Sequence, residues 1–343
     1  MIDLNSIPVA IKTGADSYLI AYQLPEPMLD QWSSRAPDAQ FKLEVSRLGG
    51  DAWMPLGVQK IGQSFKVPKS FGPIPLFRTE TEDGHRYIGL RKIDLQGTSN
   101  FRDIGGYLTE KGLQLRFGRI FRSDNLSKLT SSDWEVIKGL GISKIIDLRR
   151  SDEKARSQTV VPLDSGIEII EIPIDVEILG KSELIEHIFS KAIKRVTNDD
   201  MAQMYEDLLA KSRSELAQTV SLLLEPTQTS TIVHCTAGKD RTGLSVALVQ
   251  LLLSVPQQQV MSDFLLSNAF RTPTRIAALS EKLKSHQVNI DDIFPYLSAS
   301  KQALLRAFKI LDSQYEGAID YLNFDETYAP TSTDEWKTHI LYT

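Results

Sequence analysis

Cysteine is almost absent from this chain, because Cys235 is the single thiol among 343 residues. One cysteine excludes an internal disulfide and a zinc site built from several thiolates. Histidine is also scarce, and the five histidines do not show the spacing of a metal-binding motif. We therefore expect no metal and no other cofactor. A lone thiol that must stay reduced favours a reducing compartment.

Long apolar runs and a strong excess of positive charge are absent too. No stretch of about 18 or more apolar residues occurs, so we expect no transmembrane helix. The first residues lack a charged segment followed by an apolar one, so no signal peptide is visible. We expect a cytoplasmic protein, or a secreted one in its mature form without its signal peptide. The net charge of -5 argues against a general affinity for nucleic acid or anionic membranes.

The composition that remains is that of a globular protein, with 41% hydrophobic and 24% charged residues and a length typical of two domains. Residues 1–93 contain short alternating or apolar runs, separated by prolines and glycines, at 17–23, 41–48, 73–80 and 85–92. This pattern predicts strands. We expect a small β-sandwich domain there, immunoglobulin-like or fibronectin-like.

From about residue 95 the pattern changes to strands that alternate with helices. Short apolar runs at 143–149, 166–174 and 230–235 predict buried strands, and helical patterns lie between and after them. This order predicts an α/β domain with parallel strands over residues 95–325. We expect residues 326–343 to form a loosely ordered tail.

The single cysteine lies between a predicted strand and a predicted helix, in the segment TIVHCTAGKDRTG. A loop that leads into a helix collects free backbone N–H groups at the positive end of the helix dipole, which makes an anion-binding cradle. Gly238 supplies the backbone freedom that such a loop needs. The same field favours a Cys235 thiolate that acts as nucleophile. Arg241, six residues later, has a planar guanidinium that suits two oxygens of a phosphoryl group.

Two neighbouring side chains complete this predicted site. The Thr242 hydroxyl could hydrogen-bond the sulfur when it leaves, and the ring of His234 could orient the loop. Together these residues predict that Cys235 attacks a phosphate monoester to give a phosphocysteine, which water then hydrolyses. Another group must protonate the leaving alcohol and then activate the water.

Other interpretations of the segment agree less well with it. A lone cysteine is commonly a small buried hydrophobic residue, but the spacing of cysteine, glycine and arginine favours catalysis. The segment is not a nucleotide-binding phosphate loop, because Asp240 and Val233 stand where that motif needs Ser or Thr and Gly. A cysteine protease needs no arginine at this spacing.

The segment HCTAGKDRTG resembles the signature HCxxGxxR[ST] of cysteine-based protein phosphatases, and in its fuller form that of bacterial tyrosine and lipid phosphatases. Further segments match in order: NFRDIGGY (100–107), GRIFRSDNLSKLT (118–130), GISKIIDLR (141–149), DFLLSN (263–268) and YEGAIDYL (315–322). The resemblance covers residues 95–323 and implies the cysteine-phosphatase fold, a mostly parallel central sheet flanked by helices. It implies no metal, and activity on phosphotyrosine, sometimes on phosphoserine or phosphothreonine, and on phosphoinositides.

The roles that the resemblance implies fall on matching positions, with Cys235 as nucleophile and Arg241 as phosphate ligand. The rest of the phosphate-binding loop comprises Thr236, Ala237, Gly238, Lys239, Asp240 and Thr242. Lys239 and Asp240 are expected to face the substrate. Because a loop lysine contacts extra phosphates in related lipid phosphatases, Lys239 hints at inositol-phosphate substrates.

The identity of the general acid stays open. Asp175 follows a predicted strand and matches the candidate acid of the family, and Asp240 within the loop is the alternative. Asp147 is expected to be structural, paired with a nearby arginine or a backbone N–H. We expect Arg102 and Asp103 to pair with each other and to support the loop from behind.

We therefore expect a protein tyrosine phosphatase, or one of dual specificity, whose partner is a phosphorylated protein. A phosphoinositide or inositol-phosphate phosphatase is the alternative within the enzyme class. A catalytically silent protein that binds phosphorylated ligands is the alternative from another class. An amphipathic pattern at 182–196 predicts a helix, either packed on the fold or mobile as a lid. The sequence does not indicate an oligomeric state.

Overall fold

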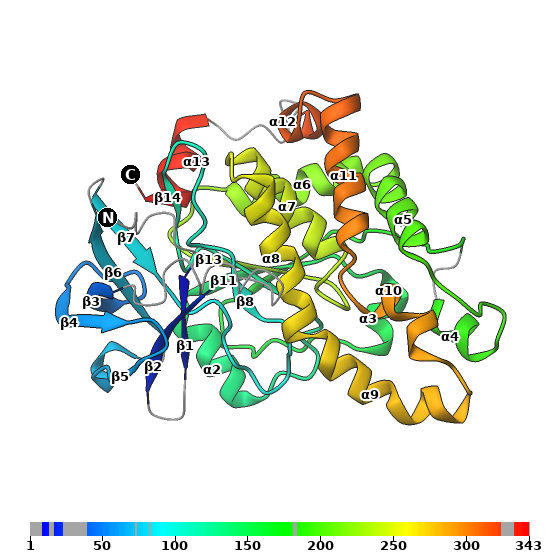
Figure 1. Cartoon of the computed structure of the whole chain (residues 1–343), viewed down its shortest axis with the longest axis horizontal. Coiled ribbons are helices and arrows are strands. Elements are labelled where there is room, and N and C mark those ends of the chain that lie inside the picture. Colours follow the sequence, from blue (N-terminus) through cyan, green and yellow to red (C-terminus); the bar gives the residue numbers. More distant parts are fainter. Residues whose placement is uncertain are drawn as a thin grey trace.

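The protein was analysed as a computed structural model, which describes residues 9–13, 17–22, 40–72, 74–81, 84–180, 184–323 and 333–342. Small antiparallel sheets lie at the N-terminal end of the chain, and a five-stranded sheet lies between helices (Figure 1). The expected α/β fold with a small β-sandwich before it is confirmed.

Two antiparallel sheets form the N-terminal part. Their strands are β1 (Val9–Thr13), β2 (Tyr18–Tyr22) and β5 (Ser64–Phe65), and then β4 (Met54–Lys60), β3 (Gln40–Arg47), β6 (Pro75–Thr81) and β7 (Gly84–Ile88). Strands β2, β3, β6 and β7 confirm the four predicted ones. Phe41, Leu43 and Val45 alternate along β3 and are fully buried, as the two-residue period of a strand requires. Phe77 lies against Phe65 and Tyr18, so aromatic rings join the two sheets.

The five-stranded sheet has the order β12-β11-β13-β10-β8. These strands are β12 (Glu168–Glu171), β11 (Ile142–Asp147), β13 (Ser230–His234), β10 (Ile120–Ser123) and β8 (Arg102–Asp103). Pairings among the first four are parallel, and β8 pairs antiparallel with β10. Strand β13 therefore lies in the middle, where a parallel strand is covered on both faces.

The sheet separates two hydrophobic cores. Ile145 and Ile232 pack toward α2 (Ser131–Gly139), whereas Ile146 and Val233 pack toward the larger group of helices. Neighbouring residues of one strand point to opposite faces, which explains the near-continuous apolar runs of β11 and β13. Because side chains of β13 are packed in both cores, the position of this strand is fixed, and so is the start of the loop that follows it.

Helices account for most of the chain after β12. Helix α3 (Ser151–Arg156) precedes β12. The described helices after β12 are α4 (Leu184–Phe189), α5 (Asn198–Lys211), α6 (Arg213–Leu224), α7 (Arg241–Leu252), α8 (Gln257–Phe270), α9 (Thr272–Ser285), α10 (Phe294–Leu297), α11 (Lys301–Gln314), α12 (Ala318–Leu322) and α13 (Thr333–Ile340). The long helix predicted at 182–196 is shorter in the structure. Helix α4 ends at Phe189, and Lys191 has a φ of 61°, a left-handed conformation that stops a helix. Leu184 and Ile188 anchor α4 in the core.

The last described segment is ordered, so the expected loose tail is a wrong prediction for residues 333–342. Helix α13 leads into β14 (Leu341–Tyr342), which pairs antiparallel with β9 (Gln114–Leu115). Ile340 and Leu341 are buried, and Arg116 Nε donates to the Leu341 carbonyl over 2.7 Å. The sequence pattern is too short to reveal a strand whose partner is more than 200 residues away along the chain.

This C-terminal strand also joins the N-terminal sheets to the rest of the protein. The rings of Tyr87 and Tyr342 stack at a centroid distance of 3.6 Å and an angle of 11°. Gln114 accepts from the Tyr87 N–H and donates to the Tyr87 carbonyl. Figure 1 shows β14 close to β7, at the same side of the molecule as the N-terminal strands.

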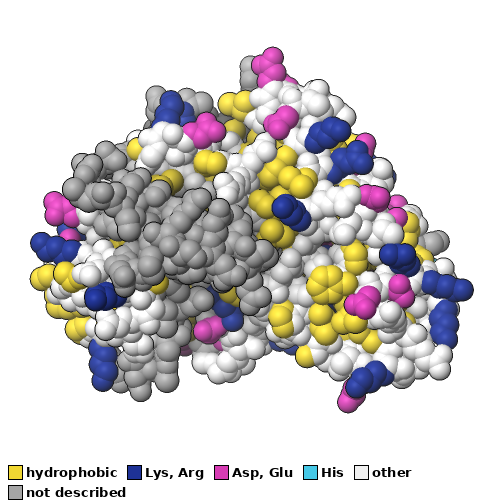
Figure 2. Space-filling model, in the orientation of Figure 1, with side chains coloured by type: hydrophobic (Ala, Val, Ile, Leu, Met, Phe, Trp, Pro, Cys, Tyr) yellow, Lys and Arg dark blue, Asp and Glu magenta, His cyan; other side chains and the backbone are white. Residues whose placement is uncertain are grey.

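The visible surface carries no large field of one charge. On the face drawn in Figure 2, basic and acidic side chains are interspersed over the helical half. Among the described helices, none is long and apolar enough to cross a membrane.

The stacked tyrosines give a test of how the N-terminal sheets are held. Tyr87→Ala and Tyr342→Ala should each lower the free energy of unfolding, and a double-mutant cycle should give a coupling of about 0.5–1.5 kcal/mol, as aromatic pairs do. The coupling is measured by urea unfolding of wild type, the two single variants and the double variant. Val58→Ala, at an exposed position of β4, is the control and should not couple to Tyr342→Ala. Additive effects of the two tyrosine substitutions would contradict the contact.

Candidate active site

The loop that contains Cys235 joins the central strand β13 to helix α7. Gly238 has a φ of +64°, and a Cβ there would lie 2.4 Å from the Ser123 carbonyl oxygen. Only glycine fits both constraints. The Gly238 N–H donates to the Cys235 sulfur over 3.2 Å, so the loop curls around the thiol as predicted.

The carbonyl of Gly238 is held by two side chains. Asn100 Nδ2 donates to it over 3.0 Å and Arg122 Nη2 over 2.9 Å. In a trans peptide group the C=O and the N–H point in opposite directions, so the Lys239 N–H is directed away from these two side chains. Asn100 and Arg122 were missed as site residues, although both lie in segments that carry the family resemblance.

Asp263 of α8 holds the arginines behind the loop. Its carboxylate contacts Arg122 Nη1 at 2.6 Å and Arg102 Nε at 3.3 Å. Burial raises the pKa of the Asp263 carboxyl, but the charges of Arg102 and Arg122 outweigh this and the net shift is downward. Arg102 also donates to Asn100 Oδ1 over 2.6 Å, so it supports the loop through Asn100.

The expected pair between Arg102 and Asp103 is a wrong prediction. Asp103 accepts instead from the N–H groups of Gly105 and Gly118, over 2.7 and 2.6 Å. The two residues are neighbours in β8, and neighbours in a strand point to opposite faces. Burial raises the pKa of the Asp103 carboxyl to about 6.

Arg241 opens helix α7 and is fixed by a carboxylate that the sequence analysis missed. Both terminal nitrogens of Arg241 contact Glu153, each over 2.7 Å. Burial raises the pKa of Glu153, but Arg241 outweighs it and lowers the pKa to about 2. Thr236 Oγ1 also donates to Glu153 over 2.5 Å. The sequence holds one signal for Glu153, since it caps α3 by accepting from the Arg150 N–H.

His234 and Asp147 lie under the loop and are structural. His234 Nδ1 lies 3.3 Å from the Cys235 carbonyl oxygen, and burial lowers the pKa of the ring to about 4. Asp147 accepts from Arg149, with 2.7 Å between Oδ2 and Nη2 and 3.0 Å between Oδ1 and the backbone N. The expectation was that Asp147 pairs with an arginine or a backbone N–H, and the structure shows both contacts.

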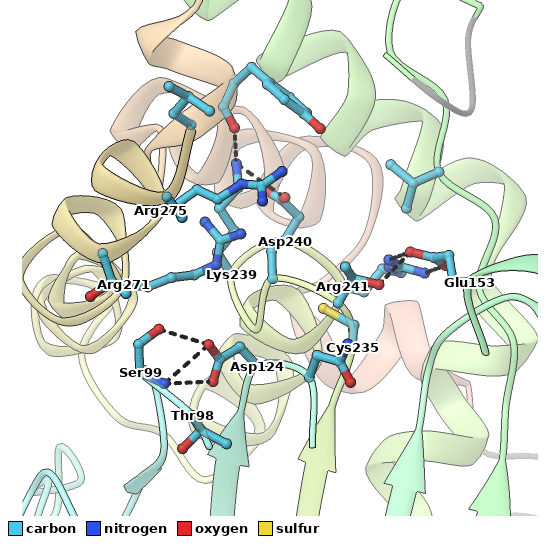
Figure 3. A pocket seen from close by; sticks show the side chains of 18 of the residues that line it. Thr98, Ser99, Asp124, Glu153, Cys235, Lys239, Asp240, Arg241, Arg271 and Arg275 are labelled. Carbon is cyan, nitrogen blue, oxygen red and sulfur yellow. Dashed lines mark hydrogen bonds and ion pairs between the residues drawn. The ribbon is translucent and has the colours of Figure 1, made fainter. Parts of the chain in front are cut away.

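A pocket of about 500 Å³ opens over the loop (Figure 3). Cys235 lines it together with Thr236 and Ala237 of the loop. The acidic and basic lining residues are Asp124, Lys128, Arg150, Glu153, Lys239, Asp240, Arg241, Arg271 and Arg275. Part of the wall is apolar, from Val176, Ile178, Leu184, Tyr296 and Leu297. Arg271 and Arg275 were also missed by the sequence analysis.

The two candidate acids differ in position. Asp240 lines the pocket, and its carboxylate contacts Lys239 Nζ at 3.2 Å and the Tyr205 hydroxyl at 3.3 Å. The side chain of Asp175 is exposed and is not among the lining residues, although its neighbour Val176 is. The structure thus brings Asp240, and not Asp175, into the pocket of Cys235.

Lys239 does not offer a free ammonium to the pocket. Its Nζ donates to the carbonyls of Tyr296 and Ser298 over 2.7 and 2.9 Å and contacts Asp240. Burial lowers the pKa of this lysine. Lys239 therefore ties the loop to the C-terminal end of α10, which differs from the expected contact with an extra phosphate.

Thr242 lies in the first turn of α7 and is fully buried. Within the described part of the chain, its hydroxyl has no hydrogen-bond partner. This leaves the hydroxyl available to the sulfur. The same described residues include no cluster of three metal-ligand side chains.

The buried neutral ring of His234 makes stability depend on pH. Because its pKa is about 4 in the folded protein and about 6.5 in an unfolded chain, the ring contributes full stability above pH 6.5. This contribution falls as the pH drops toward 4, by up to about 3 kcal/mol. His234→Gln should remove this loss, measured as the free energy of unfolding in urea between pH 4 and 7. The raised pKa of Asp103 makes the free energy of unfolding depend on pH in the opposite direction. This effect is the same in wild type and in His234→Gln, so it cancels when the two proteins are compared. If the free energy of unfolding depends on pH in the same way in wild type and in His234→Gln, the prediction is contradicted.

Comparison with known proteins finds several relatives of this chain. A candidate tyrosine-protein phosphatase of Cupriavidus necator is 24% identical over 234 residues, which is 68% of this chain and 84% of that protein. The triple specificity protein phosphatase PtpB of Mycobacterium tuberculosis is 29% identical over 212 residues, 56% of this chain and 74% of its own. The crystal structure of P. aeruginosa TpbA aligns over 57% of this chain and 90% of its own with 14% identity and a TM-score of 0.24, too low to support an inference.

The sequence model of the tyrosine phosphatase family matches residues 93–342, nearly three quarters of the chain. The match spans β8 to β14 and includes the whole of the loop around Cys235. This chain belongs to the tyrosine phosphatase family.

Proposed function

We propose that the protein removes phosphate from phosphotyrosine in proteins, with Cys235 as nucleophile, Arg241 as phosphate ligand and Asp240 as general acid. The observation that carries the proposal is the loop itself. The Cys235 sulfur accepts from the Gly238 N–H at the start of α7, and Arg241 is locked beside it by Glu153. Such a cradle binds the three free oxygens of a phosphate ester around a thiolate.

In the first step the Cys235 thiolate attacks the phosphorus and the bond between phosphorus and the tyrosine oxygen breaks. Asp240 gives its proton to the leaving phenolate. The charge on the phosphoryl oxygens is stabilised by the loop N–H groups and by the guanidinium of Arg241. The Tyr205 hydroxyl and Lys239 hold the Asp240 carboxylate at the pocket.

In the second step a water molecule attacks the phosphocysteine. Asp240, now a carboxylate, takes a proton from the water, and the bond between sulfur and phosphorus breaks. The departing thiolate is stabilised by the Gly238 N–H and by the buried Thr242 hydroxyl. The products are inorganic phosphate and the enzyme in its starting state.

The apolar part of the pocket supports an aromatic substrate. Val176, Ile178 and Leu184 lie on the wall together with Tyr296 and Leu297. An aromatic ring gains free energy from burial against such a surface. A polyol ring would lose hydration there without a polar partner. This favours phosphotyrosine over an inositol phosphate as the scissile group.

The remaining proposals concern organisation and location. We propose that residues 1–93 form a separate β-sandwich domain that packs on the catalytic domain through Tyr87, Gln114 and Tyr342. The nucleophile is a free thiol, which needs reducing conditions to stay active. We therefore propose a cytoplasmic location, with secretion of a mature form as the alternative.

Replacement of the nucleophile separates an enzyme from a silent binding protein. Wild type should release phosphate from a phosphotyrosine peptide, and Cys235→Ser should lower kcat by at least about 10³-fold. Phosphate release and peptide binding are measured for both proteins. Peptide binding by both proteins without release by wild type would instead support the binding protein.

The general acid is tested with leaving groups of different basicity. Asp240→Asn should lower kcat by about 10²–10⁴-fold for phenyl phosphate, whose leaving group needs a proton, and far less for p-nitrophenyl phosphate. Asp175→Asn is the matched control, because it removes the same charge outside the pocket. A leaving-group effect in Asp175→Asn, and none in Asp240→Asn, would assign the acid to Asp175.

A further inference from the structure

Two arginines enter the active-site pocket from helix α9 and have no role in the chemistry described above. Arg271 directly precedes α9 and Arg275 lies one turn later, and both line the pocket. In Figure 3 both side chains point inward from α9 toward Lys239 and Asp240. Cys235, Arg241 and Glu153 lie on the other side of these two loop residues.

The other partly or fully buried cations of the pocket are matched by carboxylates. Arg241 pairs with Glu153, Lys239 with Asp240, and Arg150 with Asp152. Among the residues that the structure describes, the guanidinium groups of Arg271 and Arg275 have no side-chain hydrogen bond and no ion pair within 4.0 Å. This side of the pocket therefore holds two unmatched positive charges.

Such an arrangement is unfavourable for the protein alone. Like charges one helical turn apart repel each other, and both residues are half-buried. Burial, and then the charge of Arg271, lower the pKa of Arg275. Asp240, which lines the same pocket, already contacts Lys239 and Tyr205. An anion from the substrate would neutralise this side of the pocket.

We propose that Arg271 and Arg275 bind a second phosphate monoester of a doubly phosphorylated peptide, next to the phosphotyrosine that Cys235 attacks. Two cations match the charge of a phosphate monoester, about -1.5 to -2 at neutral pH, better than that of one carboxylate. Guanidinium groups also bind phosphate oxygens in pairs. The apolar wall accommodates the tyrosine ring, which makes a peptide fit better than a polyol phosphate. This inference rests on the proposed function.

The experiment compares kcat/KM for matched substrates. One peptide carries phosphotyrosine alone. The second also carries, at a nearby position, a phosphonate analogue of phosphoserine that cannot be hydrolysed. Wild type should prefer the second peptide by about 10- to 100-fold, the range for hydrogen bonds to charged groups. In Arg271→Gln/Arg275→Gln the preference should vanish, because the loss of kcat/KM should fall on the second peptide far more than on the first.

Lys284→Gln is the control, since it removes an exposed charge from α9 and should keep the preference. The arginine variant should also be at least as stable as wild type to urea, because it relieves repulsion. Equal loss on both peptides, or no preference in wild type, would overturn the inference. A larger arginine-dependent gain on a soluble inositol bisphosphate than on the peptide would overturn the assignment to a peptide.

If the proposed function itself is wrong, the result differs: wild type releases no phosphate from either peptide. Binding then decides the inference by itself. Cys235→Ser should bind the doubly phosphorylated peptide about 10- to 100-fold more tightly than the singly phosphorylated one. The same substitution combined with Arg271→Gln/Arg275→Gln should bind both peptides equally. Equal affinities already in Cys235→Ser would overturn the second phosphate site.

Discussion

The active site depends on the orientation of one peptide carbonyl, that of Gly238. Asn100 and Arg122 both donate to this oxygen, and the N–H of the same glycine donates to the Cys235 sulfur. A loop with the carbonyl reversed would present a partial negative charge to an incoming phosphate. Gly238 alone permits the conformation, because its φ is positive and the Ser123 carbonyl leaves no room for a Cβ.

Behind this carbonyl lies a buried charged network that joins three distant segments. Asp263 from α8 contacts Arg102 of β8 and Arg122 of β10. Burial of charges is costly unless hydrogen bonds satisfy them. Here the arginines also bind Gly238, Asn100 and Ser267. Two cations share one carboxylate, so the network leaves positive charge beneath a loop that must bind an anion.

The pocket combines two different electrostatic conditions. On one side Arg241 is balanced by Glu153, which fixes the guanidinium. On the other side Arg271 and Arg275 remain unbalanced. Preorganised charge of the first kind serves the transition state, because no reorganisation is needed at the moment of reaction. Unbalanced charge of the second kind serves recognition, since only an anionic ligand relieves it.

The sequence by itself determined the chemistry and the fold class. The loop around Cys235 is a local motif, so the positions of Cys235, Gly238 and Arg241 between a strand and a helix could be predicted from spacing alone. Period and turn residues predicted the main strands. Pairing of Arg102 with Asp103 could not be predicted correctly, because adjacent strand residues face opposite sides. The ordered β14 was missed because its partner β9 lies far away in the chain.

Only the tertiary structure decided which side chains meet at the pocket. Glu153, Arg271 and Arg275 reach it from α3 and α9, and their distance from Cys235 in sequence gives no hint of contact. The same folding engages Lys239 with backbone carbonyls and leaves Asp175 exposed while Asp240 enters the pocket. Local motifs specify the reacting atoms, whereas the packing of helices against the sheet selects the charges that surround them.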